Sequence, residues 1–522
     1  GKPIAAAVRE RSLFMNPIAT NSLPSMAPND ADVGPDESSF DPHEVVRRLY
    51  PLLRTSVGPS FGRSLRIVGE YLPISIDSVP SGRRVGDWIV PNEWELDEAY
   101  VEDPDGRRRL DVADHSLRIV NGSTAVDLEL PFERLRERLH VHPSLDDAIP
   151  YRTAYYEPSW GFCLSRNELR ALEASDDGRP WRAVIRSRRS PGRLEWGSLV
   201  LPGRQQDEIV FSAHLCHPSL ANDNLSGIAA AIGLARRLMT QERRWTYRFL
   251  FLPGTIGPIA WWSKEARVGS RTIGGAVLSM VGDDSPLRYR CSLTGESLWD
   301  RACRDESSLA GHLEPFAPDG YDERQWNSAG IGMPIGRFSR ADWATWPRYH
   351  GSFDDLSACS RESIESTIDT LACIVRRVES RELPRATWGP GEPRLGRHGL
   401  WNSPIFGLDD AAWRRTVGWL GALADGRTEL AEIARRSGTD ESVLREVAIR
   451  LSAFGLLDRG EGLPAVTSDR ESVANPRRRE VETPRDEATA PHDAAERQAF
   501  EPAPTTNRSG ARPQESIRRG AR

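Results

Sequence analysis

The sequence lacks three features that would place it in other classes of protein. Its six cysteines are far apart and form no C-x-x-C pair, which argues against a zinc site made of cysteines alone. In a chain of this length such cysteines are typical of reduced, mostly buried thiols in a cytoplasmic protein. The longest apolar stretch, residues 249–262, is too short to span a bilayer and contains two prolines and two glycines. The apolar run at residues 4–8 is too short for the core of a signal peptide.

The sequence also has no marked excess of basic residues. The formal net charge is −6, with 39% hydrophobic and 28% charged residues, which is the profile of a soluble globular protein with some disordered sequence added. We therefore expect neither nucleic acid nor a membrane as a partner. A length of 522 residues is enough for two or three domains, each with a sizeable core.

Shifts in composition and periodicity divide the chain into five parts, one of which consists of two separate segments. In residues 79–149, short runs of alternating apolar and polar residues are broken by Pro-Asp-Gly and Asn-Gly, which indicates hairpins. After residue 149, strand patterns at 183–186, 195–201, 208–214, 246–252 and 276–281 alternate with helix patterns at 166–174, 225–239, 259–265, 296–307 and 361–379, which predicts a mixed sheet covered by helices on both faces. We expect a tail at 1–36, an α/β domain at 37–78 and 150–382, a β-rich insert at 79–149, a winged helix at 383–460 and a disordered tail at 461–522.

The winged helix is predicted from three helical patterns, at residues 411–423, 430–436 and 442–454, followed by strand-like residues. Between Arg385 and Arg459, 11 arginines oppose 10 acidic residues, and the second helix of the motif carries only Arg445 and Arg450. Because DNA affinity depends on neutralising phosphates, we do not expect this unit to bind duplex DNA. It would instead pack on the α/β domain or mediate self-association.

The densest chemical signal is FSAHLCHPSLANDNLSG, residues 211–227. An apolar strand ends at His214, a polar loop carries His217 and Asp223, and a helix of small residues follows. Open α/β sheets place their sites at such strand ends, and imidazole with carboxylate suits zinc. The same residues are also explained by a turn capped by Asn and Asp.

Two further motifs carry candidate side chains. The loop WPRYHGSFDDL, residues 346–356, contains His350, which could return a third ligand to the first motif. The turn DGYDERQW, residues 319–326, contains Glu323 and Arg324. On composition alone this turn is a solvated charge cluster.

Taken together, the motifs H-x-C-H-P-S-x-A-N-D-N-x-S-G, D-E-R-Q and Y-H-x-S-x-D resemble a group of bacterial aminopeptidase-like proteins of unassigned function. Members of this group are often associated with loci for surface-polysaccharide biosynthesis. Segments 149–165 and 255–262 match it as well, and the resemblance covers roughly residues 40–460, including the β-rich insert and the winged helix. The group is similar to the co-catalytic zinc aminopeptidases, which implies an aminopeptidase-like α/β fold.

This sequence departs from the two-zinc aminopeptidases at three carboxylates. Where those enzymes carry a Glu-Glu pair it has Thr255 and Ile256, and where they carry the Asp of L-D-M-x-G it has Ser279. The resemblance therefore implies one zinc, held by a histidine, Asp223 and His350, with an open position for water. We prefer His217 as the histidine because its loop can curl around an ion, with His214 as the alternative ligand or as the partner of a ligand.

Catalysis by such a site needs a base and an acid. With the Glu-Glu pair absent, Glu323 is our candidate for both roles, and Arg324 for binding a substrate carboxylate or stabilising an oxyanion. Arg152 and Tyr349 are candidates for substrate contact. The sequence thus predicts a zinc-dependent hydrolase that cleaves a peptide or N-acyl bond with one zinc-activated water. The alternative is a catalytically reduced binding protein on the same scaffold.

Overall fold

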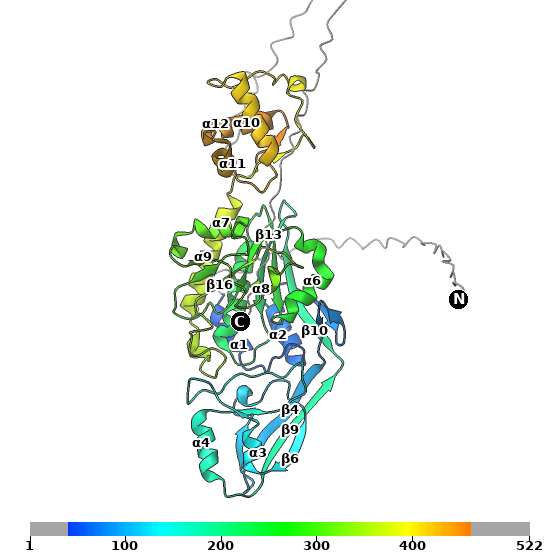
Figure 1. Ribbon diagram of the computed structural model, residues 1–522, viewed down its shortest axis with the longest axis vertical. Helices are drawn as coiled ribbons and strands as arrows, with labels where there is room; N and C mark the ends of the chain where they lie inside the picture. Colours follow the sequence, from blue (N-terminus) through cyan, green and yellow to red (C-terminus); the bar gives the residue numbers. More distant parts are fainter. Residues whose placement is uncertain (1–39, 461–522) are drawn as a thin grey trace, which may run out of the picture. The chain divides into compact units, whose positions relative to one another are not determined.

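The computed structural model describes residues 40–460. The tails predicted at 1–36 and 461–522 lie outside this range. A large sheet of eight strands forms its centre (Figure 1). In spatial order its strands are β1 Ser75–Pro80, β10 Arg193–Leu201, β12 Thr246–Leu252, β11 Glu208–His214, β13 Thr272–Leu278, β16 Gly336–Ser339, β14 Arg288–Arg290 and β15 Leu313–Glu314.

The sheet is mixed, as predicted. Strands β12, β11, β13 and β16 are parallel to their neighbours in this group, whereas β10 and β14 flank the group in the antiparallel sense. The four parallel strands therefore end at the same edge of the sheet. Segments that follow them meet there, which is where open α/β folds place their sites.

Helices cover both faces of the sheet because side chains along each strand alternate. Ile209, Phe211 and Ala213 of β11 belong to one core, and Val210 belongs to the other. The first core also includes α1 Pro42–Leu49, α2 Pro59–Gly69, α5 Gly227–Met239, α7 Leu298–Arg304 and α9 Arg361–Glu379. The second includes α6 Ile256–Gly269 and α8 Glu323–Trp326.

A smaller sheet has the strand order β5-β4-β9-β6. Its strands are β5 Arg108–Asp111, β4 Glu93–Glu102, β9 Trp181–Ser190 and β6 Val126–Leu130. Nearby lie α3 Phe132–Arg136, α4 Arg166–Ser175 and the pair β7 Leu139–His140 with β8 Phe162–Cys163. The short pair β2 Arg84–Val85 with β3 Trp88–Ile89 packs instead against α6, which covers the large sheet.

The small sheet extends beyond the β-rich insert expected at 79–149. Its strand β9 pairs with β4 on one side and β6 on the other, so the strand expected at 183–186 belongs to this sheet and not to the α/β sheet. Only two residues separate the end of β9 from the start of β10, which joins the large sheet. Alternation of side chains identified the strand, but it carries no information about the partner strand.

The C-terminal unit has its own hydrophobic core, which includes Trp413, Leu420, Ile433 and Leu444. Its elements are α10 Asp410–Leu423, α11 Leu430–Ser437, α12 Glu441–Ala453 and β18 Leu457–Asp458, which pairs with β17 Arg385–Ala386. They follow the helical patterns expected for a winged helix. Within residues 40–460, no helix is both long enough and apolar enough to cross a bilayer.

Candidate metal centre

The loop that follows β11 is held in place by buried polar side chains. The Asp354 carboxylate accepts hydrogen bonds from the backbone N–H groups of Asn222 at 2.7 Å and Asp223 at 2.9 Å. The Asn222 side chain donates to Asp283, and the Asn224 side chain donates to the carbonyl of Leu278 at the end of β13. The segment thus connects two strand ends, which fixes the direction of the Asp223 side chain.

Three histidines converge on Asp223. Its Oδ1 atom lies 2.9 Å from Nε2 of His214, and its Oδ2 atom lies 3.3 Å from Nδ1 of His217 and 3.1 Å from Nε2 of His350. The ligand-type atoms of His214, His217 and Asp223 all lie within 4.8 Å of one another. The structure therefore brings together all four residues named from the sequence as possible ligands.

This donor set fits a zinc ion. Two ligands of a tetrahedral zinc, each about 2.0–2.1 Å from the ion, are about 3.3 Å apart, close to the distances between these histidines and Asp223. Asp223 Oδ2 and His350 Nε2 lie near each other without hydrogen-bond geometry, and both are buried without a hydrogen-bond partner among the described residues. Buried polar atoms without partners carry a free-energy cost, which a bound cation would remove.

Burial and mutual proximity shift the pKa values of the cluster in different directions. Burial lowers the pKa of His214 to about 4, although the Asp223 carboxylate opposes this effect. Burial likewise lowers the pKa of His350. For His217 burial opposes charge, but the adjacent Asp223 carboxylate raises its pKa above the ordinary value. Burial opposes ionisation of Asp223 too, yet the imidazoles hold its pKa well below the usual range. Two neutral imidazoles and one carboxylate are the protonation states that a metal requires.

Among the four side chains of the cluster, that of His350 is the most exposed to solvent. The side chain of His350 is 33% exposed, whereas those of His214, His217 and Asp223 are 0%, 7% and 3% exposed. Tyr349 stacks on His350 with 3.9 Å between the ring centroids. A small molecule would reach the cluster past these two rings.

The remaining sequence candidates lie in different surroundings. Glu323 is fully buried: one carboxylate oxygen accepts from the backbone N–H of Tyr321 at 3.1 Å, and the other lies 3.3 Å from Arg337. Arg324 is exposed. Burial raises the pKa of Tyr349, and the charges of Arg337 and Arg324 oppose this shift. Arg152 follows the buried Tyr151 but its own side chain is exposed.

Sequence reasoning assigned no role to several side chains that contact the cluster. Tyr151 lies edge-on to His217 and His350, with centroid distances of 5.0 and 5.1 Å. The fully buried Arg54 donates to the carbonyl of His217. The Tyr321 hydroxyl lies 3.4 Å from Nε2 of His217. The motif Y-D-E-R contained Tyr321, but no local signal distinguished it from a surface residue.

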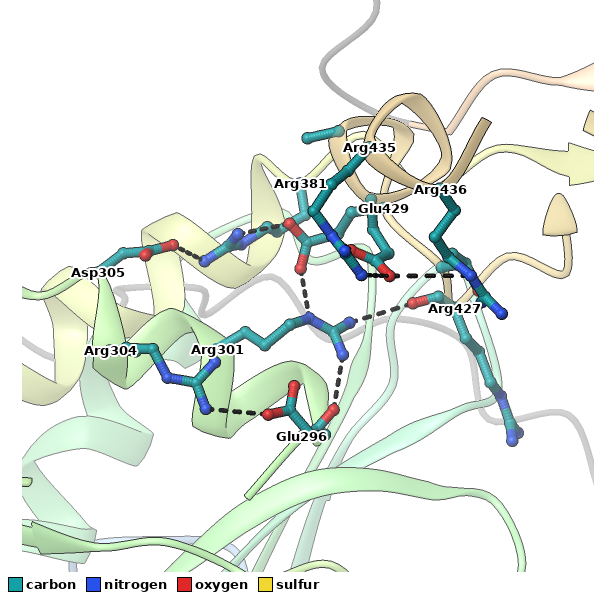
Figure 2. Close-up of a pocket in the computed structure, with 12 residues that line it drawn as sticks. Glu296, Arg301, Arg304, Asp305, Arg381, Arg427, Glu429, Arg435 and Arg436 are labelled. Atoms are coloured by element: carbon teal, nitrogen blue, oxygen red, sulfur yellow. Dashed lines mark hydrogen bonds and ion pairs between the residues drawn. The ribbon is translucent and has the colours of Figure 1, made fainter. Parts of the chain in front are cut away.

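A second group of charged side chains lines a pocket on α7, the end of α9 and the winged helix (Figure 2). Glu429 accepts from Arg301 and Arg381, Arg304 pairs with Glu296, and Arg381 also pairs with Asp305. Because these arginines already have carboxylate partners, the pocket has the character of an ion-pair network that connects segments of the chain.

A mixed α/β sheet with a buried His/Asp cluster at the end of a parallel strand is the arrangement expected of an aminopeptidase-like fold. The profile of a family described as a domain of unknown function (DUF4910) matches residues 43–381, and a profile described as winged helix-turn-helix matches residues 382–459. The chain belongs to the first family. The resemblance, the fold class and the winged helix expected from the sequence are thereby confirmed.

A named relative and a solved structure, both from Clostridium acetobutylicum, agree with this assignment. A protein of Clostridium acetobutylicum named "Putative polysaccharide biosynthesis protein with aminopeptidase-like domain" is 30% identical over 424 residues, or 81% of this chain and 96% of the relative. A crystal structure of a "putative peptidase" from that organism has a TM-score of 0.64 at 29% identity and covers 80% of this chain and 95% of its own. BSAP, a zinc aminopeptidase from Bacillus subtilis, has a TM-score of 0.48 at 14% identity and covers 65% and 94%.

Proposed function

We propose that this protein is a zinc-dependent hydrolase that cleaves an amide bond, either a peptide bond or an N-acyl bond. The observation that carries the proposal is the convergence of three imidazoles, of which that of His350 is partly exposed, on the buried carboxylate of Asp223. When bound there, one zinc ion would supply Lewis-acid chemistry that activates water. The protein's own contribution is a cluster whose loop is held by Asp354 and whose most exposed member, His350, stacks on Tyr349.

Residues around His350 would orient the substrate. Arg324 is exposed, its charge acts on Tyr349, and it could bind a substrate carboxylate, because guanidinium and carboxylate groups form paired hydrogen bonds. Arg152 remains a candidate for a more distant contact. The assignment of Glu323 as the base also remains a prediction, although Arg337 and the backbone of Tyr321 already engage its carboxylate.

The name of the Clostridium acetobutylicum relative supports an N-acyl group on a sugar-linked molecule as one substrate class, and a short peptide as the other. Within the described chain all six cysteines are unpaired thiols, which fits the proposed location in the cytoplasm. We propose no nucleic acid and no membrane as partners, with self-association of the chain as a further possibility.

A second candidate function is binding without catalysis. It is favoured by Thr255, Ile256 and Ser279, which stand where the two-zinc aminopeptidases carry carboxylates. If all three histidines and Asp223 bind the ion together, its coordination shell is closed, as in structural zinc sites. If three of the four bind it, one position stays open for water.

Zinc content, coordination number and turnover together test the proposal. The full chain is loaded with zinc, its coordination shell is measured by X-ray absorption, and it is screened against aminoacyl p-nitroanilides and N-acetylhexosamine derivatives. We expect one zinc per chain with three protein ligands, and hydrolysis of one of these classes. Asp223→Asn should lose zinc affinity by at least about 100-fold, since it removes a charged ligand.

Asp284→Asn, a change at an exposed aspartate, serves as the control and should keep both zinc and turnover. A zinc ion with four protein ligands, combined with no hydrolysis of either class, would support the binding protein instead. Absence of zinc from the wild-type protein would refute both functions.

A further inference from the structure

The turn after β12 has no acidic side chain of its own. Gly254 has no side chain, and Thr255 has a positive φ of 62°, a conformation that non-glycine residues rarely adopt. This turn stands where the two-zinc aminopeptidases carry their Glu-Glu pair. In this protein two residues that immediately precede α8 occupy the space beside it.

The first of these residues is Tyr321. Its hydroxyl oxygen fills the space that a side chain on Gly254 would need, so glycine is required there. Its ring lies over His214 with 4.0 Å between centroids, and its hydroxyl lies 3.4 Å from His217. Tyr321 thus connects the turn after β12 with the histidine cluster.

The second residue is Asp322, which is fully buried. Its Oδ1 atom accepts a hydrogen bond of 2.7 Å from the backbone N–H of Thr255. Its Oδ2 atom has no hydrogen-bond partner among the described residues. A buried carboxylate oxygen without a partner is costly unless a ligand uses it, so this atom marks a place where a proton or a polar substrate group is received.

The neighbouring Glu323 differs in its charge environment. Its Oε1 atom also lacks a hydrogen-bond partner among the described residues, but it lies 3.3 Å from Nε of Arg337, whose positive charge compensates it, and its Oε2 atom accepts from the backbone of Tyr321. The Oδ2 atom of Asp322 forms neither a hydrogen bond nor an ion pair within residues 40–460. Of the two adjacent carboxylates, Asp322 is therefore the one free to exchange a proton. This assignment differs from the expectation drawn from the sequence, which favoured Glu323.

We propose that Asp322 is the proton acceptor of this site and replaces the carboxylate missing from the turn after β12. The proposal rests on the proposed function. Asp322 accepts one proton from a water molecule, the water oxygen forms a bond to the amide carbon, and the carbon–nitrogen bond breaks. The same proton passes to the leaving nitrogen, which departs as an amine, and Asp322 returns to its carboxylate form.

The electrostatic surroundings of Asp322 agree with this role. Burial raises the pKa of Asp322 to about 7, and the negative charge of Glu323 acts in the same direction. The N–H of Thr255 and the charges of Arg324 and His217 oppose this shift. A carboxyl group that titrates near neutral pH is suited to accept and return a proton.

Proton counting tests the role of Asp322 without any knowledge of the substrate. Acetohydroxamate, a metal-directed probe, is titrated into the zinc-loaded full chain at pH 8 by calorimetry in buffers of different ionisation enthalpy. In the wild type the proton that the probe loses should stay on Asp322. In Asp322→Asn about one more proton should appear in the buffer, with affinity at least about tenfold lower and zinc content unchanged.

Three further variants make the result decisive. Asp322→Glu should restore the wild-type proton count. If Asp322→Asn does not fold, Asp322→Ser, which also removes the carboxylate, takes its place. Asp284→Asn, which removes an exposed carboxylate, is the control and should behave as the wild type. Glu323→Gln tests the competing assignment.

The outcomes separate the inference from the function on which it rests. An equal proton count in the wild type and Asp322→Asn would overturn the inference alone, as would a proton released only in Glu323→Gln. Zinc that binds but does not accept acetohydroxamate would overturn the proposed hydrolase as well.

Discussion

The His/Asp cluster and the winged-helix unit differ in where their charged side chains lie and how completely these are paired. In the cluster, Asp223 is 3% exposed and faces three imidazoles with incomplete hydrogen bonding. In the winged helix, Arg435 pairs with Glu432 on the surface, and Arg445 pairs with Glu382 and Glu441. Surface pairs contribute about 0–1 kcal/mol each, whereas buried charge without full compensation costs several kcal/mol. A fold retains the second kind of arrangement where a ligand completes it.

Backbone conformation separates the two regions in the same way. Within residues 40–460 the non-glycine residues with positive φ are Ser219, Thr255, Met280 and His350. Each lies in the segment that follows one of the four parallel strands, β11, β12, β13 and β16. In the winged helix only glycines adopt such conformations. Strained backbone thus gathers at the edge of the sheet that carries the cluster, as is typical of functional sites.

The largest expected effect is on the pH dependence of stability of the metal-free protein, and it comes from the buried carboxyl of Asp322. Its folded-state pKa is about 7, whereas an unfolded aspartate titrates near about 3.9. The folded state therefore binds this proton more tightly, so stability falls as pH rises from about 4 to about 7, and the full cost above pH 7 is at most about 4 kcal/mol. Asp322→Asn should raise the free energy of unfolding in urea more at pH 8 than at pH 5.

Asp300→Asn provides the comparison, because this carboxylate accepts hydrogen bonds from Ser292, Ser297 and Tyr289 and its loss should destabilise the fold. If Asp322→Asn changes the free energy of unfolding equally at both pH values, burial does not raise the pKa of the Asp322 carboxyl.

The next effect concerns Asp354, whose carboxylate accepts hydrogen bonds from the backbone of the loop. Asp354→Asn keeps one acceptor oxygen but cannot accept from both Asn222 and Asp223. We expect zinc affinity to fall about 10–100-fold, as for other residues that orient ligands. Competition with a chromophoric chelator measures it. Asp355→Asn, at the adjacent position, should leave the affinity as in the wild type, and an equal loss in both variants would argue against a specific role of Asp354.

A smaller effect is expected in the ion-pair network of Figure 2. Glu429 is 13% exposed and accepts from Arg301 and Arg381, so Glu429→Gln should lower the free energy of unfolding by about 1 kcal/mol. The more exposed Glu432 pairs only within its own helix, and Glu432→Gln should cost less than about 0.5 kcal/mol. Urea denaturation compares the two, and a larger cost for Glu432→Gln would contradict this ranking.

The smallest expected effect is the binding of duplex DNA by the winged helix. Arg445 of α12 is paired with Glu382 and Glu441, and Arg450 lies over the ring of Phe454 at 5.1 Å. With few free cations to neutralise phosphates, fluorescence anisotropy should show no submicromolar binding at physiological salt. Such binding, lost on deletion of residues 400–460, would break the contrast between the two regions.

Sequence periodicity located most elements of the large sheet. The strands expected at 208–214 and 246–252 match β11 and β12 at both ends, and the helix expected at 361–379 matches α9. The spacing of apolar residues and the residues that begin and end a helix or strand are properties of local sequence, so they can be recognised without knowledge of the fold. Motif order likewise identified His214, His217, Asp223 and His350 as the residues that the structure brings together.

Tertiary structure alone decided which strands pair with each other and which groups contact each carboxylate. Strand β9 pairs with β4 and β6 in the small sheet. Both partners lie far from it in sequence, so the local pattern of β9 could not reveal them. Asp322 and Glu323 are adjacent and chemically alike, yet Arg337 engages one, and Thr255, 67 residues away, engages the other. The free oxygen of Asp322 depends on these long-range contacts. Local sequence specifies which groups a residue offers, whereas packing specifies which of them stay unsatisfied.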